Sequence, residues 1–251
     1  MLLKNSAMKT LRNLVILLFT GLLLGGCAVS YVPNSVNTPL FDQKGEALAS
    51  VNAGFSGYDV QTAYAVTDHI GVMLNGSFDS QQSDPNYKHS HTYVEAGAGW
   101  FGKIGQYGRY EIYTGYGMGP TETYYKRKNI IGDFFVIDSV GVFNQRLFLQ
   151  PSIGFKSDYA EASLSSRFVF LHLSPQYYLH RIEGNPNSET SYPARPNTFY
   201  WEPVLTIKGG GKKLKGYIQG GISWPLQSNP DHYNNIFIFS LGLQYRFNLK
   251  E

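Results

Sequence analysis

Residues 237–247 read FIFSLGLQYRF and alternate strictly between two kinds of side chain. Side chains of a β-strand point to opposite faces with a period of two, whereas a helix repeats its faces every 3.6 residues. A strand of this length, tilted, is long enough to cross a lipid bilayer. The first face carries Phe237, Phe239, Leu241, Leu243, Tyr245 and Phe247, and the second carries Ile238, Ser240, Gly242, Gln244 and Arg246.

The same alternation recurs upstream as far as Glu46, and the sequence contains no convincing amphipathic helix there. The expected strands exceed the usual length of about 5–6 residues. We therefore predict an all-β fold, a single antiparallel up-and-down transmembrane β-barrel over residues 46–251, with about ten strands and eight as the alternative. The expected strands are 46–55, 58–67, 69–78, 91–102, 108–118, 145–156, 159–173, 198–208, 214–224 and 236–248.

The composition indicates which face of these strands meets lipid. Only 16% of the residues are charged, against about 25% in a soluble domain. The polar face consists mainly of Gly, Ser, Ala and Gln, which suit a crowded lumen better than a water-facing surface. Its isolated charges are expected to face the lumen and to compensate one another there. These lumen-facing candidates are Asp59, Glu95, Glu111, Arg167, Glu202 and Arg246.

Short and long connections alternate along the chain. The links at 67–68, 103–107, 157–158 and 209–213 are short, whereas 79–90, 119–144 and 174–197 are long and 225–235 is intermediate. Outer-membrane barrels have short periplasmic turns and long external loops. The pattern therefore predicts three large external loops.

Aromatic residues gather near the ends of the expected strands, as at the membrane–water interface of outer-membrane barrels. In this pattern, and in the aromatic final strand around Phe247, the chain resembles the small outer-membrane barrels of the OmpA/OmpX type. The resemblance implies insertion by the outer-membrane assembly machinery. Pro151 and Pro203 fall inside expected strands and cannot donate a ladder hydrogen bond, so bulges or strand starts are expected there.

The N-terminus has the features of a secretory signal. Lys4, Lys9 and Arg12 precede an apolar stretch over 14–24 that is too short to span a bilayer as a helix. Translation can start at Met1 or at Met8, because either start leaves a complete signal.

The apolar stretch ends in LGGC, residues 24–27, which resembles the lipobox of bacterial lipoproteins. The resemblance implies a signal peptide over 1–26, removed on processing, and a Cys27 that carries acyl chains such as palmitate. It also implies an outer-membrane location, because Ala28 stands where an aspartate commonly marks inner-membrane retention. Residues 27–45 show no periodicity and are predicted to form a flexible tether.

Charge excludes one class of partner. The formal charge of +3 belongs to the three basic residues of 1–26, and the remainder holds 18 basic and 18 acidic residues. Nucleic-acid binding therefore has no electrostatic support. The expected partners are the lipid bilayer and the insertion machinery, and the sequence identifies no external ligand.

No motif supports catalysis, a cofactor or a metal, so we predict a protein that is not an enzyme. Gly97, Gly99 and Gly102 match a dinucleotide fingerprint but lie inside an expected strand, where that motif needs a helix. His89 and His91, near Asp84, lack a third ligand at diagnostic spacing.

Three functions remain open. The first is a structural or surface-interaction role, with a lipid-anchored barrel presenting large loops. The second is a narrow channel for small solutes. The third is a lipid-anchored soluble periplasmic β-barrel that binds an apolar ligand inside.

Overall fold

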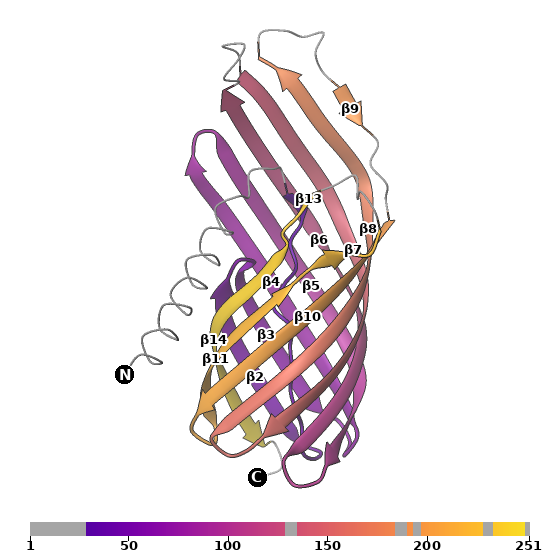
Figure 1. The fold of residues 1–251 in the computed structure, drawn as a ribbon, viewed down its shortest axis with the longest axis vertical. Helices are drawn as coiled ribbons and strands as arrows, with labels where there is room; N and C mark the ends of the chain where they lie inside the picture. Colours follow the sequence, from indigo (N-terminus) through magenta and orange to yellow (C-terminus); the bar gives the residue numbers. More distant parts are fainter. Residues whose placement is uncertain (1–28, 129–134, 184–189, 193–196, 228–232, 249–251) are drawn as a thin grey trace, which may run out of the picture.

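The computed structural model describes residues 29–128, 135–183, 190–192, 197–227 and 233–248, which form one tall β-barrel (Figure 1). Each long strand pairs antiparallel with its neighbour along the chain, and β14 pairs with β2 to close the ring. The predicted all-β, up-and-down barrel of ten strands is confirmed. The ten strands are β2 (Glu46–Gly54), β3 (Gly57–Ala65), β4 (Ile70–Asp84), β5 (Tyr87–Ile104), β6 (Gly108–Lys128), β7 (Phe135–Lys156), β8 (Ala160–Ile182), β10 (Asn197–Gly210), β11 (Leu214–Ile222) and β14 (Phe237–Asn248).

Four short strands lie outside the ring order. β1 (Val29–Tyr31) pairs parallel with β13 (Tyr233–Asn234), β9 (Thr190–Tyr192) pairs antiparallel with β8, and β12 (Trp224–Pro225) pairs antiparallel with β10. Within the described part of the chain, no helix is long and apolar enough to cross a membrane.

The two ends of the barrel differ. At the end we call the turn end, links at 66–69, 105–107, 157–159 and 211–213 join neighbouring strands. At the opposite end, the loop end, β4 to β8 rise above the rest of the wall (Figure 1). The predicted loops at 79–90, 119–144 and 174–197 are therefore largely wrong, because much of each consists of strand. At the loop end, pairing between β6 and β7 continues to Lys128 and Phe135. These two strands are therefore longer than a crossing of the bilayer requires.

Neither proline forms a bulge, which corrects the sequence-based expectation. The β8–β10 register runs without a shift through Pro203, and the β6–β7 register runs without a shift through Pro151. Between β7 and β8 the partners pass from Leu149 and Phe168 to Ser152 and Ser165 without an inserted residue. Each proline lies inside a continuous strand, and the strand lacks one ladder hydrogen bond there because proline has no N–H.

The outer face carries a continuous belt of exposed apolar side chains. Leu241 and Leu243 of the stretch that decided the fold are 53% and 55% exposed, while their neighbour Ser240 is fully buried. Large apolar groups on the outside of a closed barrel need lipid around them, so the predicted orientation of the alternating faces is confirmed. Other members of the belt include Val51, Val60, Ile70, Val72, Leu74, Val94, Ile112, Met118, Leu147, Leu149, Ile153, Leu164, Leu205, Ile207 and Ile218.

The belt has a visible upper edge toward the loop end. On β4 the outward side chains change from Phe78 to Ser80 and Gln82. On β5 they change from Val94 to Thr92 and Lys88. The parts of β4 and β5 above these positions therefore lie outside the membrane-spanning segments.

Candidate functional site

The lumen is occupied by the chain's own N-terminal segment. Residues 30–41, which we call the plug, pass from the loop end to the turn end and are buried throughout, from Ser30 at 1% to Phe41 at 0% exposed. β1 holds the start of the plug at the loop end, where Asn235 N donates to Tyr31 O (3.0 Å). Residues 30–41 of the predicted flexible tether therefore form an ordered segment that fills the lumen. The lumen wall supplies hydrogen-bond partners along the whole length of this segment.

Near the loop end, two arginines and one carboxylate hold the plug. Arg146 donates to Val32 O (2.9 Å) and to Asn34 Oδ1 (3.2 Å). Asn34 Nδ2 in turn donates to Glu95 Oε1 (3.3 Å). Arg167 completes the group with an ion pair to Glu95 at 2.5 Å. Buried charges need such compensation, and the plug supplies part of it.

In the middle of the lumen, side-chain amides take the place of a β-ladder. Gln219 accepts from Val36 N (2.7 Å) and donates to Val36 O (2.8 Å), so one amide satisfies both backbone groups. Gln150 Nε2 donates to Asn37 O (2.8 Å), and Asn37 Nδ2 donates to Asn75 Oδ1 (2.8 Å). These contacts supply the partners that buried backbone groups require.

Toward the turn end, cations bind consecutive carbonyl groups of the plug. Lys208 Nζ donates to Thr38 O (2.6 Å), Arg246 Nη2 to Pro39 O (2.7 Å) and Lys156 Nζ to Leu40 O (2.8 Å). The plug ends on Phe41, whose ring packs against Phe101 at 5.4 Å between centroids. Phe101 is therefore a lumen residue, although it lies near the end of an expected strand, where aromatic residues were expected at the membrane interface.

The six charged residues singled out in the sequence all face the lumen and all contact the plug. Glu202 accepts from Tyr31 OH (2.7 Å), Asp59 from Ser35 N (3.3 Å) and Glu111 from Leu40 N (2.9 Å). Glu95, Arg167 and Arg246 make the contacts to Asn34 and Pro39. The sequence placed these side chains on the inner face, and the structure gives them one common partner.

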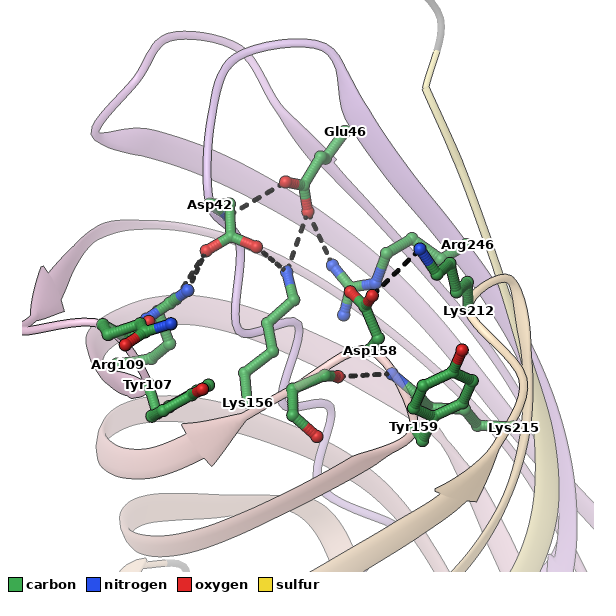
Figure 2. Close-up of a pocket in the computed structure, with 12 residues that line it drawn as sticks. Asp42, Glu46, Tyr107, Arg109, Lys156, Asp158, Tyr159, Lys212, Lys215 and Arg246 are labelled. Atoms are coloured by element: carbon green, nitrogen blue, oxygen red, sulfur yellow. Dashed lines mark hydrogen bonds and ion pairs between the residues drawn. The ribbon is translucent and has the colours of Figure 1, made fainter.

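An ion cluster surrounds the point where the plug leaves the lumen (Figure 2). Lys156 pairs with Asp42 at 2.6 Å and with Glu46 at 3.2 Å, and Arg246 pairs with Glu46 at 2.7 Å. Asp42 also pairs with Arg109. These residues line a cavity of about 550 Å³ that reaches the turn end. Partial burial raises the pKa of the Asp42 carboxyl, but the charges of Lys156 and Arg109 outweigh burial and hold this pKa below its usual value.

The two histidines considered in the sequence analysis come together above the belt. His89 and His91 of β5 are buried and lie beside Asp79 of β4. The carboxylate considered from the sequence was Asp84, whose side chain lies outside the described residues. Asp79 was missed because it is ten residues away from His89 in sequence, although it pairs across the strands with His91.

The glycines that match the dinucleotide fingerprint lie on a strand. Gly97, Gly99 and Gly102 are within β5, which is followed by β6 and not by a helix. β6 ends in three basic residues, 126–128, and there Lys126 pairs with Glu183 at 2.8 Å.

The plug itself was missed from the sequence. One signal was present: residues 28–41 contain no charged residue and include Tyr31, Val32, Val36, Leu40 and Phe41. A tether in water seldom has this composition, because linkers in water are usually polar.

Comparison with known proteins finds no matching family model and no matching curated relative by sequence. Solved structures that are similar to this chain include two bacterial proteins. The translocator domain of autotransporter NalP from Neisseria meningitidis matches with a TM-score of 0.43 and 11% identity, covering 80% of this chain and 87% of that chain. LpxR from Salmonella typhimurium matches with a TM-score of 0.35 and 6% identity, covering 81% and 99%.

The sequence-based prediction that this chain is not an enzyme is withdrawn: it rested only on the lack of a catalytic motif, and LpxR, an outer-membrane enzyme, is among the similar barrels. At this similarity the match shows the fold alone and assigns no activity to this chain. The closed ring of ten strands and its apolar outer belt make this chain a β-barrel protein of the bacterial outer membrane.

Proposed function

We propose that the protein is a self-plugged outer-membrane barrel that presents its tall loop-end wall and its own N-terminus at the cell surface for interaction with a partner. The observation that carries this proposal is the course of the plug from the loop end to the turn end.

The orientation follows from the connections. Outer-membrane barrels place short turns in the periplasm and their longer connections outside. The turn end of this barrel therefore faces the periplasm, and the wall of β4 to β8 rises outside the cell. Val29, the residue before the plug, lies at the external end because β1 pairs with β13 there.

The plug argues against the alternative of a narrow channel. Twelve consecutive residues of the plug are buried in the lumen, and wall side chains bind their backbone groups from Val32 to Leu40. The apolar belt argues in the same way against a soluble periplasmic barrel, because its side chains need lipid.

The lipid anchor is the second part of the proposal. Cys27 precedes Val29 by two residues, a reach of about 7 Å. On this proposal, acyl chains on Cys27 enter the outer leaflet at the external end of the barrel. Labelling with radioactive palmitate, present on the wild-type chain and lost with Cys27→Ala, tests the acylation itself.

Cysteine labelling of intact cells tests the topology. Cys27 is the only native cysteine, so Cys27→Ala with an ordinary signal peptide gives a background without thiols. We expect Ala28→Cys in this background to react with a membrane-impermeant maleimide on intact cells. Gln227→Cys, exposed near the loop end, is the positive control, and Lys212→Cys, exposed at a turn, is the control for the periplasmic side.

Lys212→Cys should react only after the outer membrane is permeabilised. Labelling of Ala28→Cys that likewise needs permeabilisation, while Gln227→Cys reacts on intact cells, would overturn the proposed course of the N-terminus.

A further inference from the structure

We infer that Asp79, His89 and His91 form a binding site for a divalent transition-metal ion of the Zn²⁺ type, just outside the membrane at the external end of the barrel. The site joins two neighbouring strands on their inward face. Asp79 of β4 pairs directly with His91 of β5, and His89 is the next residue on the same face of β5.

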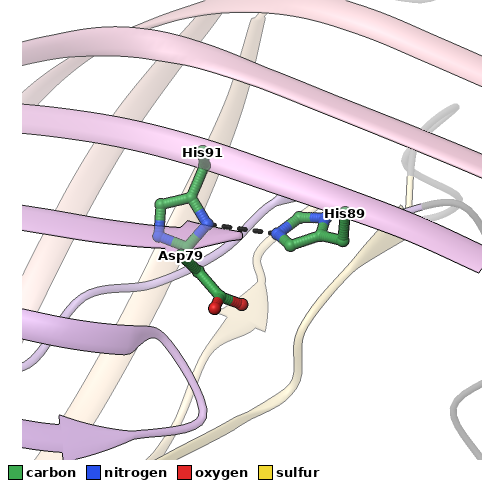
Figure 3. A group of neighbouring side chains, drawn as sticks. All are labelled: Asp79, His89 and His91. Carbon is green, nitrogen blue, oxygen red and sulfur yellow. Dashed lines mark hydrogen bonds between the residues drawn. The ribbon is translucent and has the colours of Figure 1, made fainter. Parts of the chain in front are cut away.

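The spacing of the donor atoms suits a metal ion. His89 Nε2 and His91 Nδ1 lie 3.1 Å apart. Two imidazoles on one tetrahedral zinc ion, each about 2.0–2.1 Å from the metal, have nitrogens about 3.3 Å apart. One carboxylate oxygen of Asp79 and one nitrogen of each histidine all lie within 4.8 Å of one another. Figure 3 shows the Asp79 carboxylate to one side of the line that joins the two rings.

The other nitrogen of each ring has its own partner. His89 Nδ1 lies 2.8 Å from Thr123 Oγ1, and His91 Nε2 lies 3.3 Å from Ser77 Oγ. Metal-binding histidines usually donate their second ring N–H to such a neighbour, which fixes the tautomer and the ring orientation. If His89 Nδ1 and His91 Nε2 both donate to these neighbours, His89 Nε2 and His91 Nδ1 point their lone pairs at each other and repel. A cation bound by both nitrogens replaces this repulsion with two coordinate bonds.

Burial favours the ligand form of both rings. His89 and His91 are 7% and 5% exposed. Burial disfavours the charged imidazolium, and a metal ligand must be the neutral imidazole.

Space beside the site fits the same interpretation, because His89 and Thr123 line a cavity of about 290 Å³. The charges nearby act in both directions. The Asp79 carboxylate compensates part of the metal charge, whereas Arg146, stacked on Tyr93 at 3.7 Å, opposes a cation. Two nitrogens and one oxygen favour Zn²⁺ over Ca²⁺ or Mg²⁺, which prefer oxygen ligands alone.

Isothermal titration of the folded, untagged barrel in detergent micelles with zinc chloride tests the site. We expect one Zn²⁺ per chain, no heat of binding with calcium chloride, and loss of the Zn²⁺ site in His89→Gln and in His91→Gln. Asp79→Asn should weaken binding, and Thr123→Val, which removes only the neighbour of His89, should weaken it about 10-fold. The matched control is His172→Gln, a histidine that contacts Asn197 away from this site.

Each variant is first checked for a heat-modifiable band on a denaturing gel, so that loss of binding is measured only on folded barrels. A Co²⁺ absorption spectrum of a nitrogen- and oxygen-ligated ion, absent from His91→Gln, gives a second readout. The inference is overturned by wild-type protein that takes up no Zn²⁺, or by a binding isotherm that His89→Gln and His91→Gln leave unchanged. Equal weakening by His172→Gln would overturn it too, since it indicates binding spread over surface histidines.

Discussion

Glu95 on β5 and Arg167 on β8 form an ion pair across the lumen, with Glu95 Oε2 2.5 Å from Arg167 Nη2 and both side chains almost fully buried. Two strands, β6 and β7, separate them around the ring. Asn34 of the plug contacts both residues. This pair therefore ties two separate parts of the wall and the plug into one unit.

Removing the charge of Glu95 should destabilise the barrel strongly. Glu95→Gln leaves the Arg167 guanidinium buried without its counter-charge, and breaking such a pair costs about 3–5 kcal/mol. Urea unfolding in lipid vesicles, followed by tryptophan fluorescence, measures this free energy. The control is Glu183→Gln, which removes the exposed partner of Lys126 and should cost less than about 1 kcal/mol. Equal effects of the two substitutions would contradict the prediction.

Deleting residues 29–41 should open the lumen to ions. The wild-type barrel should show no conductance in a planar bilayer, whereas the deleted barrel should show stepwise conductance, because the wall then encloses water where the plug lay. A synthetic peptide of residues 29–41 should reduce that conductance, and a scrambled peptide should not. Conductance of the wild-type chain that equals that of the deletion would show that the plug does not seal the barrel.

A cation placed on the belt should impair insertion. Leu241 is 53% exposed in the middle of β14, and an arginine near the bilayer midplane costs about 2–4 kcal/mol. We expect Leu241→Arg to lower the free energy of unfolding by about this amount in lipid vesicles. Ser80→Arg, an outward position above the belt, should change it by about 1 kcal/mol or less. The reverse ranking would place the membrane elsewhere on the barrel.

The Asp42 carboxylate should give stability that is lost in acid. Lys156 and Arg109 outweigh partial burial and lower the pKa of this carboxyl in the folded state. Its contribution is therefore fully present above the unfolded pKa of about 3.9 and disappears as pH falls through the lower folded pKa.

Asp42→Asn should cost about 1–3 kcal/mol at neutral pH, the value of hydrogen bonds to charged groups. The difference from wild type should shrink at pH values below about 4, as measured by urea unfolding. Asp158→Asn removes a fully solvated pair with Lys212 and should show little difference at any pH. A wild-type advantage that persists unchanged in acid would exclude an ionic origin.

The sequence by itself determined the alternating faces, the ten strands and the direction in which the apolar side chains point. Period-two alternation is a local property, so the sequence of residues 237–247 is enough to show which side chains share each face of the strand. Closure of the ring follows because an open edge within a bilayer leaves backbone groups unsatisfied. The inward charges could also be identified one by one, since each stands on the polar face of its own strand.

Only the tertiary structure decided what those charges bind. The plug has no periodicity, and its partners lie up to 207 residues away, as for Arg246 and Pro39. Local pattern says nothing of such contacts, because a segment without regular hydrogen bonds is specified by the wall around it. The same reason applies to Asp79, His89 and His91, whose meeting depends on the register between β4 and β5. The height of the wall was likewise set by pairing between β6, β7 and β8, which extends strands beyond the length that the membrane demands.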